Sequence, residues 1–263
     1  PRTRKDKEHR VDDRHARLIL LAKNEAGYRN LLKLVSKGYT EGFYYRPRID
    51  RELMQAHREG LIAILPSFSG EHAHAIKDGA VDRARESLDW YKHLYGDDLY
   101  LEITHHPEIE NHEDLQKRIA ALGKEMHVPL VAAHDTYYLK SEDAVARELV
   151  NKIRTGGTLN RDVDENAPDF SFITRAAATE LFKDTPEALD NTIRIAEECD
   201  LTLKLGAWLF PDFPVPEGTT HDAELRNLVY QGFEWRHVPK DPEIIARVEY
   251  ELKVIADKGY SPY

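Results

Sequence analysis

Val128–Tyr138, VPLVAAHDTYY, joins an apolar run to a cluster of polar and aromatic residues, and this pattern is the best guide to the fold. Its first half is a short apolar run, which is typical of a strand covered on both faces. His134 and Asp135 follow this predicted strand at its carboxyl end, where parallel α/β folds gather ligands and catalytic groups. An Asp-x-His at such an end could hold a metal, but here the spacing gives Asp135 and Tyr137. Asp135 is therefore either a metal ligand or only the cap of the following turn.

The rest of the sequence alternates strand-like and helical patterns. Further apolar runs are Leu18–Ala22, Leu61–Leu65, Leu99–Ile103 and a weaker one at Leu201–Leu205. This alternation predicts an α/β fold with a mostly parallel sheet, either a barrel or an open doubly wound sheet. The strands are too few for an ordinary eight-stranded barrel.

Helix signals separate these runs. Asn24 is predicted to cap a helix with Tyr28, Leu31, Leu32 and Val35 facing inward. Asn111 and Asp114 resemble a capping box. Ser141 is predicted to start a helix that buries Val145, Leu149 and Ile153 and ends at Gly156. Thr185-Pro186 is a strong helix start, and two more helices are predicted at His221–Arg236 and Pro242–Lys258.

Composition limits the possible classes of protein. The 263 residues are 41% hydrophobic and 32% charged, as in an ordinary globular protein. A net charge of -10 argues against nucleic acid binding over the whole surface. Cys199 is the single cysteine, which fits a reducing, cytoplasmic setting. No membrane span or signal peptide is evident. Because the sequence starts at Pro1, we expect an internal piece of a longer protein.

Several polar side chains follow the predicted strands and are candidates for one shared site. They are Lys23, Asn24, Ser67, His105, His106, His134 and Asp135. Imidazoles and a carboxylate suit Zn or Mn. His134 and Asp135 are adjacent and should point to opposite faces, so we do not expect them to share one ion.

Two basic stretches are candidates for nucleic-acid contact. Gly42–Asp50, GFYYRPRID, places Arg46 and Arg48 beside three aromatic residues, which could stack on bases or grip phosphate. The alternative is that the aromatics pack under a loop while the arginines meet acidic neighbours. The charged run at residues 1–10 is read as a solvated loop or tail.

Longer strings resemble the family of bacterial DNA polymerase III alpha subunits. They include LLAKNEAGYRNLLKLVSKGYTEGFYYRPRID, EGLIAI, YLEI, VPLVAAHDTYYL, TPEALDNTIRIAEECDLTLKLG, FPVPEG and YELKVIADKGY. The resemblance implies a polymerase and histidinol phosphatase (PHP) domain over residues 1–210, with a (β/α)7-like barrel that lacks its N-terminal start. It also implies a Pro-rich connector and helices over residues 211–263, leading to the polymerase palm.

The same resemblance implies how the PHP metal site has changed. Family ligand positions correspond to Arg17, Ser67, Asp135 and Tyr137, and only Asp135 keeps a ligand. Arginine stays protonated and cannot bind a cation. We therefore expect no catalytic residue in this segment, a vestigial site at Asp135, and no bound Zn or Mn.

Three hypotheses remain. The leading one is a scaffold within a polymerase that makes DNA from a template-primer and dNTPs. Its Mg²⁺ would bind outside this segment, and its partners would be a proofreading exonuclease subunit and the sliding clamp. The second is a metal-dependent PHP phosphoesterase. The third is a nucleic-acid-binding module, which the charge of -10 disfavours.

Overall fold

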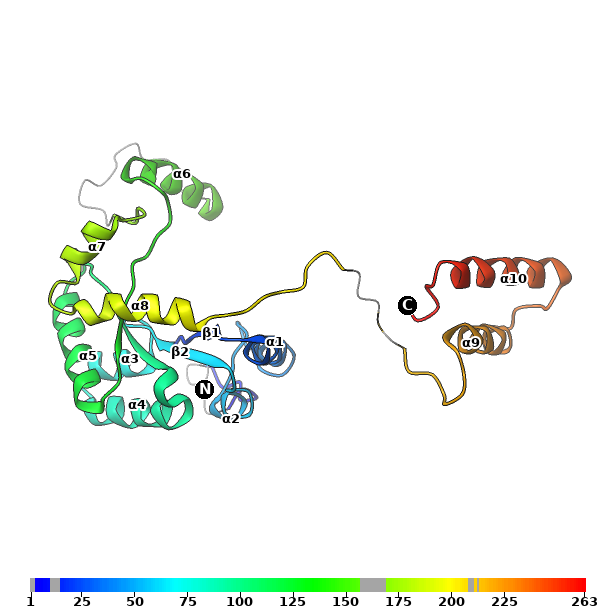
Figure 1. The fold of residues 1–263 in the computed structure, drawn as a ribbon, viewed down its shortest axis with the longest axis horizontal. Coiled ribbons are helices and arrows are strands. Elements are labelled where there is room, and N and C mark those ends of the chain that lie inside the picture. The colour runs from blue at the N-terminus through cyan, green and yellow to red at the C-terminus, as the bar shows by residue number, and fades with distance from the viewer. Residues whose placement is uncertain (1–2, 10–14, 157–168, 208–210, 212) are drawn as a thin grey trace. The chain divides into compact units, whose positions relative to one another are not determined.

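The computed structural model describes residues 3–9, 15–156, 169–207, 211 and 213–263. It divides into two compact units, Pro1–Thr202 and Leu203–Tyr263, and each is described by itself (Figure 1). The first unit has strands β1 (Ile19–Ala22), β2 (Leu61–Leu65), β3 (Leu99–Ile103) and β4 (Leu130–Ala132). Its helices are α1 (Glu25–Thr40), α2 (Arg51–Ala56), α3 (Glu71–Lys77), α4 (Val81–Tyr95), α5 (His112–Met126), α6 (Ala144–Thr155), α7 (Arg175–Leu181) and α8 (Pro186–Glu198). The predicted α/β class is confirmed.

The four strands form one sheet in the order β1-β2-β3-β4. β2, β3 and β4 run parallel, with Leu65 opposite Leu101 and Leu101 opposite Leu130. β1 pairs antiparallel with β2, which the sequence did not predict. The weak strand predicted at Leu201–Leu205 is wrong, because these residues carry no strand. A short apolar run does not by itself supply a pairing partner.

Each face of the sheet has its own apolar core. Alternate residues such as Ala63 and Leu101 pack with α3, α4 and α5 in the larger core. On the opposite face, Ile62, Ile64, Tyr100 and Val131 form a smaller core with Ile195 of α8. Figure 1 shows α8 crossing the sheet on the side away from α4. Two covered faces explain why the parallel strands read as continuous apolar runs.

The start of α1 shows how local sequence sets the geometry. Asn24 caps the helix, as predicted, because its side chain accepts a hydrogen bond from the backbone N–H of Gly27. Gly27 lies so close to Gly60 that an added Cβ would come within 1.9 Å of the Gly60 carbonyl oxygen. The inward face was only partly predicted: Leu34 is buried, whereas Leu32 and Val35 are 50% and 58% exposed.

Two other helix predictions need correction. Asn111 does precede α5, but its backbone is left-handed and its side chain makes no capping bond. α6 ends at Gly156 (φ 70°) as predicted. However, the expected inward residues Val145, Leu149 and Ile153 are exposed. The helical period was right, yet no described element packs tightly enough on α6 to bury any of its residues.

The second unit is a helical hairpin of α9 (His221–Trp235) and α10 (Pro242–Asp257), close to the predicted bounds. Arg226 donates to both carboxylate oxygens of Glu249 and joins the two helices. The predicted domain line at residues 210 and 211 falls partly outside the described residues and stays a prediction. Among the described residues, no helix has the length and apolar character to cross a membrane.

Candidate functional site at the strand ends

The sheet direction decides which predicted site residues can meet. Ser67 follows β2, His106 follows β3 and Asp135 follows β4, all at the carboxyl edge of the parallel strands. Lys23 and Asn24 follow the antiparallel β1 and therefore lie at the other end of the sheet. Lys23 forms an ion pair there with Asp98, which precedes β3 (2.7 Å). The prediction that they join the site is wrong.

A hydrogen-bonded group centred on Glu102 occupies this edge. The Ser67 backbone N–H donates to Glu102 Oε1 (3.0 Å), and the Ser67 hydroxyl donates to the same oxygen (3.2 Å). The Ser67 and Thr104 hydroxyls lie 3.0 Å apart. Ser67 is fully buried. We call Ser67, Glu102, Thr104, His106 and Asp135 the strand-end cluster.

Glu102 was missed as a site residue by sequence reasoning. The sequence does mark Glu102, because it is the one charged residue in the otherwise apolar strand Leu99–Ile103, LYLEI. Side-chain alternation places it on the same face of the sheet as Tyr100. Burial raises the pKa of the Glu102 carboxyl, and the bonds from Ser67 oppose this without cancelling it.

The histidines after β3 and β4 interact with different partners. His106 is buried, with Nδ1 3.0 Å from Glu108 Oε1 and Nε2 3.5 Å from Asp135 Oδ2. His134 instead directs Nε2 to the Ser171 carbonyl oxygen (2.9 Å). His134 and Asp135 thus have different partners, and the expectation that they do not share one ion stays a prediction. His105 is exposed and takes no part in the cluster.

Tyr137 lies among aromatic and cationic neighbours. The Arg147 guanidinium carbon is 3.9 Å from the centre of the Tyr137 ring and 4.9 Å from that of Phe170. The Tyr137 and Phe170 rings meet edge to face at 5.1 Å. The Tyr137 ring therefore makes a cation–π contact with Arg147. Arg17 is exposed at the same sheet edge, where its backbone N–H donates to the Ser69 carbonyl.

Two of the ligand positions that the resemblance implies make other contacts in this structure. The Ser67 hydroxyl is bonded to Glu102, and the Tyr137 ring carries Arg147. Within the described ranges, no three His, Cys, Asp or Glu side chains come together so as to hold a metal ion. The described arrangement can exchange protons and hydrogen bonds.

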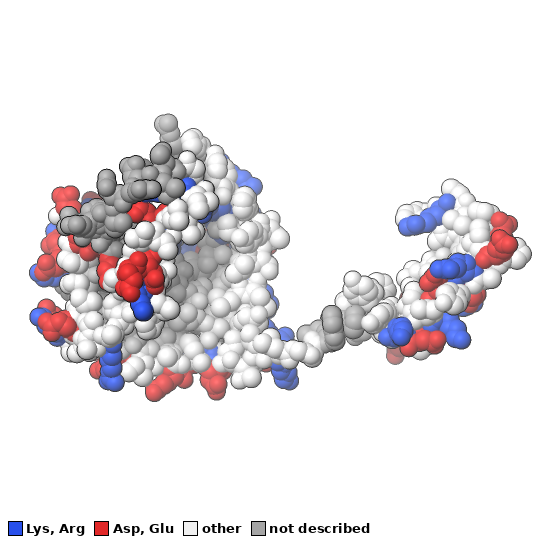
Figure 2. All heavy atoms as spheres, turned by 90° about the horizontal axis from the view of Figure 1, so that it is seen from above, with Lys and Arg blue, Asp and Glu red and all other residues white. Residues whose placement is uncertain are grey.

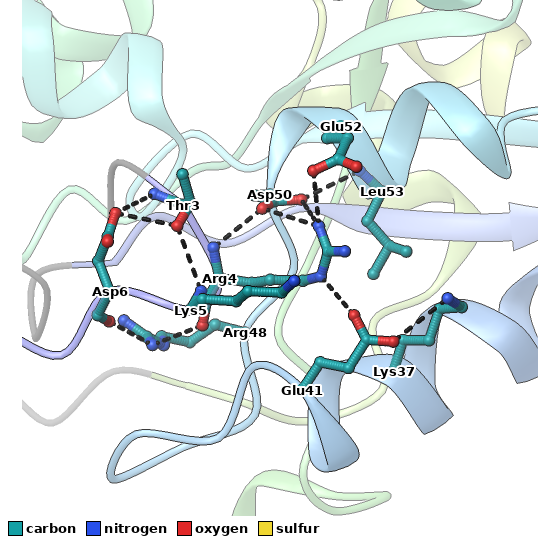
Figure 3. Close-up of polar contacts among 10 residues, drawn as sticks. All are labelled: Thr3, Arg4, Lys5, Asp6, Lys37, Glu41, Arg48, Asp50, Glu52 and Leu53. Atoms are coloured by element: carbon teal, nitrogen blue, oxygen red, sulfur yellow. Dashed lines mark hydrogen bonds and ion pairs between the residues drawn. The ribbon is translucent and has the colours of Figure 1, made fainter.

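A second polar group ties the N-terminal segment to the rest of the first unit (Figure 3). Arg4 is buried, and its guanidinium donates to Asp50 (3.0 Å) and Glu41 (2.8 Å). Arg48 is also buried and donates to the carbonyls of Gly42, Arg4 and Asp6. We call Arg4, Glu41, Arg48 and Asp50 the anchor cluster.

The anchor cluster changes two interpretations of the basic stretches. The prediction that residues 1–10 are solvated is wrong at Arg4, because this side chain is buried and bonded to carboxylates. These partners lie more than thirty residues away in sequence. Arg48 donates three hydrogen bonds to backbone carbonyls. Arg46, by contrast, is exposed, and its Nη1 lies 3.2 Å from His15 Nε2. Nucleic-acid contact through Arg46 and Arg48 stays a prediction, and a contact by Arg48 would break internal bonds.

Comparison with known proteins agrees with this architecture. Residues 4–106 match the PHP domain family. Together with the α/β fold, this match defines a PHP-domain protein. The chain is 38% identical over 253 residues to the DNA polymerase III subunit alpha of Borreliella burgdorferi, covering 94% of this chain and 22% of that protein. The corresponding subunit of Treponema pallidum is 34% identical over 271 residues, covering 100% and 23%.

A third relative, from Deinococcus radiodurans, is 35% identical over 274 residues, covering 98% of this chain and 20% of that protein. The chain belongs to the family of DNA polymerase III alpha subunits and represents its PHP-domain region. The resemblance seen in the sequence is thus confirmed. The chain spans only about a fifth of the length of these relatives.

Proposed function

We propose that this chain is the PHP-containing part of the catalytic subunit of a bacterial replicative DNA polymerase. The whole protein would extend a DNA primer along its template with dNTPs, using Mg²⁺ bound outside this segment. It would work in the cytoplasm with a sliding clamp and a proofreading exonuclease subunit. The support is that relatives named DNA polymerase III subunit alpha match nearly the whole chain.

Within that protein, we infer that the PHP metal site is degenerate. This inference rests on the contacts that the side chains at the altered ligand positions already make with other residues of the chain. Ser67 is hydrogen-bonded to Glu102, and the ring of Tyr137 holds the Arg147 cation at 3.9 Å. To gain Ser67 and Tyr137 as ligands, a metal ion at Asp135 would have to draw Ser67 away from Glu102 and Tyr137 away from Arg147.

Metal analysis tests the degenerate site against the phosphoesterase alternative. After dialysis with Zn²⁺ or Mn²⁺, the purified chain should retain far less than one metal per molecule. Hydrolysis of p-nitrophenyl phosphate should stay at the level of the buffer. Stoichiometric metal that is lost on Asp135→Asn, with hydrolysis lost in parallel, would establish the phosphoesterase instead.

The role left to the segment is that of a scaffold and docking surface for the exonuclease subunit. Support comes from α1 and its C-terminal extension, where Leu32, Val35, Tyr39 and Phe43 follow one another at helical spacing. They are 48% to 58% exposed. The Tyr39 and Phe43 rings stack at 6.2 Å. Exposed apolar side chains gathered in a row are a mark of protein interaction sites.

A binding assay tests this surface. In the full-length subunit, Val35→Lys with Tyr39→Lys should weaken capture of the exonuclease subunit in surface plasmon resonance. Val81→Lys, at an exposed apolar position on α4 (41%), is the matched control and should leave capture unchanged. Unchanged capture by the double variant would move the docking surface elsewhere.

A further inference from the structure

A basic groove opens in the first unit beside the loop that carries Arg46. Its cavity volume is about 1350 Å³, which exceeds the roughly 300–1,000 Å³ typical of small-molecule pockets. Its lining includes Arg17, Arg46, Arg51, Lys77 and Arg83, from five places in the sequence. A groove of this size suits an extended ligand better than a single small ion.

The charge of the groove is opposite to that of the whole chain. Six cationic side chains line it against three carboxylates, Asp50, Glu71 and Asp78, whereas the chain carries -10. On the face drawn in Figure 2, by contrast, basic and acidic side chains are interspersed around the first unit. A local positive groove on an acidic protein attracts an anionic ligand to one place.

Several of these cations can exchange their present partners for phosphate. Arg51 is half exposed and pairs with Glu71 at 3.1 Å. Arg83 stands 4.0 Å from Asp78, and both are exposed. Exposed pairs of this kind contribute about 0–1 kcal/mol, so a phosphate can replace them at small cost. Arg48 and Asp50 differ, because they are buried in the anchor cluster and hold the wall of the groove in place.

The loop at the edge of the groove presents an aromatic ring to solvent. Tyr45 is 70% exposed and has a left-handed backbone (φ 57°), which is unusual for a bulky residue. Two ties hold this conformation: the Tyr44 N–H donates to the Arg46 carbonyl (3.1 Å), and Arg48 is bonded to the Gly42 carbonyl. Strain held by its surroundings points to a functional site.

A positive groove with an exposed aromatic ring has the two parts of a single-strand nucleic-acid site. The cations follow the phosphates, and the ring stacks on a base. We propose that this groove binds single-stranded DNA, with Arg46 and Arg51 on the backbone and Tyr45 under a base. The proposal does not depend on the state of the metal site or on the exonuclease.

Fluorescence anisotropy with a labelled oligodeoxythymidylate of about 12 nucleotides tests the groove, using the 263-residue chain over a series of salt concentrations. Arg46→Gln with Arg51→Gln should weaken binding by about tenfold or more and reduce the salt slope by about 1.4, or 0.7 per lost contact. Arg29→Gln is the control, since Arg29 is also an exposed arginine and pairs with Glu25 on α1, outside the groove.

Tyr45→Asn separates stacking from charge, because asparagine tolerates the left-handed backbone. It should weaken binding about tenfold without altering the salt slope. Equal losses in the Arg29 control, or no loss in the groove variants, would overturn the proposal. So would displacement of the oligonucleotide by equimolar inorganic tripolyphosphate, which would assign the groove to a free polyphosphate. Photocrosslinking of a bromouracil oligonucleotide to Tyr45 in the unaltered chain gives an answer even where a variant fails to fold.

Discussion

The anchor cluster and the strand-end cluster are both largely buried polar groups in the same unit, although Asp135 is exposed, and their charges are balanced differently. In the anchor cluster, Arg4 donates to the carboxylates of Glu41 and Asp50 within 3.0 Å, and to the exposed Glu52 at 3.1 Å. In the strand-end cluster, Glu102 meets only hydroxyl and N–H donors from Ser67. In the anchor cluster, the arginine charge is balanced by carboxylates of the same chain. In the strand-end cluster, no described cationic side chain is hydrogen-bonded to the Glu102 carboxyl.

The pKa directions follow from this difference. Burial alone would raise the pKa of Asp50, yet hydrogen bonds from the Arg4 and Leu53 N–H groups and the Arg4 charge lower it. For Glu102, burial prevails and the pKa is raised. Charge in the anchor cluster therefore stabilises the fold, whereas charge on Glu102 works against it.

Arg4→Met should produce the largest effect, because it leaves Asp50 buried without its cation. Breaking a buried pair by removing one partner costs about 3–5 kcal/mol. We expect the free energy of unfolding, measured by urea denaturation, to fall by this amount. Lys5→Met is the control, since Lys5 is exposed beside Arg4 and should change stability by less than about 0.5 kcal/mol. Equal effects of the two variants would mean that Arg4 is not an anchor.

Asp50→Asn should cost about 2 kcal/mol near neutral pH, because a charged partner of Arg4 is lost. The folded pKa of Asp50 is lowered, so its stabilisation is present above the ordinary aspartate pKa and is lost as pH falls through the folded value. The variant should therefore lose less stability than the unaltered chain on acidification below about pH 4. Parallel acid limbs in the two denaturation series would contradict this assignment.

The two clusters also show what the sequence could and could not predict. Asp135 was recognisable because a polar residue directly after a buried strand has a clear position in parallel folds. The strands β2, β3 and β4 were recognisable by their continuous apolar runs. The direction of β1 was not, because an apolar run does not encode its pairing, and this alone misplaced Lys23 and Asn24.

Long-range ion pairs were equally hidden from the sequence. Arg4 and Asp50 are 46 positions apart, and nothing local marks either as a partner of the other. Asp50 does carry a local signal, since its side chain also caps α2 by accepting from the Leu53 N–H. For α6, the helical period was correct, but period alone cannot say whether another element covers the apolar face.

Glu102→Gln should have a smaller effect, of about 1 kcal/mol, and should change the pH dependence. A raised pKa means that the stability contributed by protonated Glu102 is present below the ordinary glutamate pKa and is lost as pH rises through the folded value. Glutamine keeps the oxygen that accepts from Ser67 and cannot ionise. Urea midpoints of the variant should thus be flatter above about pH 4, and equal or higher at neutral pH. A lower midpoint at neutral pH would show that the Glu102 charge is stabilising.

The smallest expected effect concerns Tyr137, for which the resemblance predicts a lost ligand position. If its role is to pack against the Arg147 guanidinium, the two side chains should be energetically coupled. A double-mutant cycle with Tyr137→Leu and Arg147→Met isolates that coupling, which exposed cation–π pairs set at about 0.5–1 kcal/mol. Adding Zn²⁺ should not stabilise any of the four proteins of the cycle, because a ligand that binds the folded state would raise its stability. Zero coupling together with Zn²⁺-dependent stabilisation of the unaltered chain would show that Tyr137 serves a metal after all, and that the strand-end cluster, like the anchor cluster, has its counter-charge.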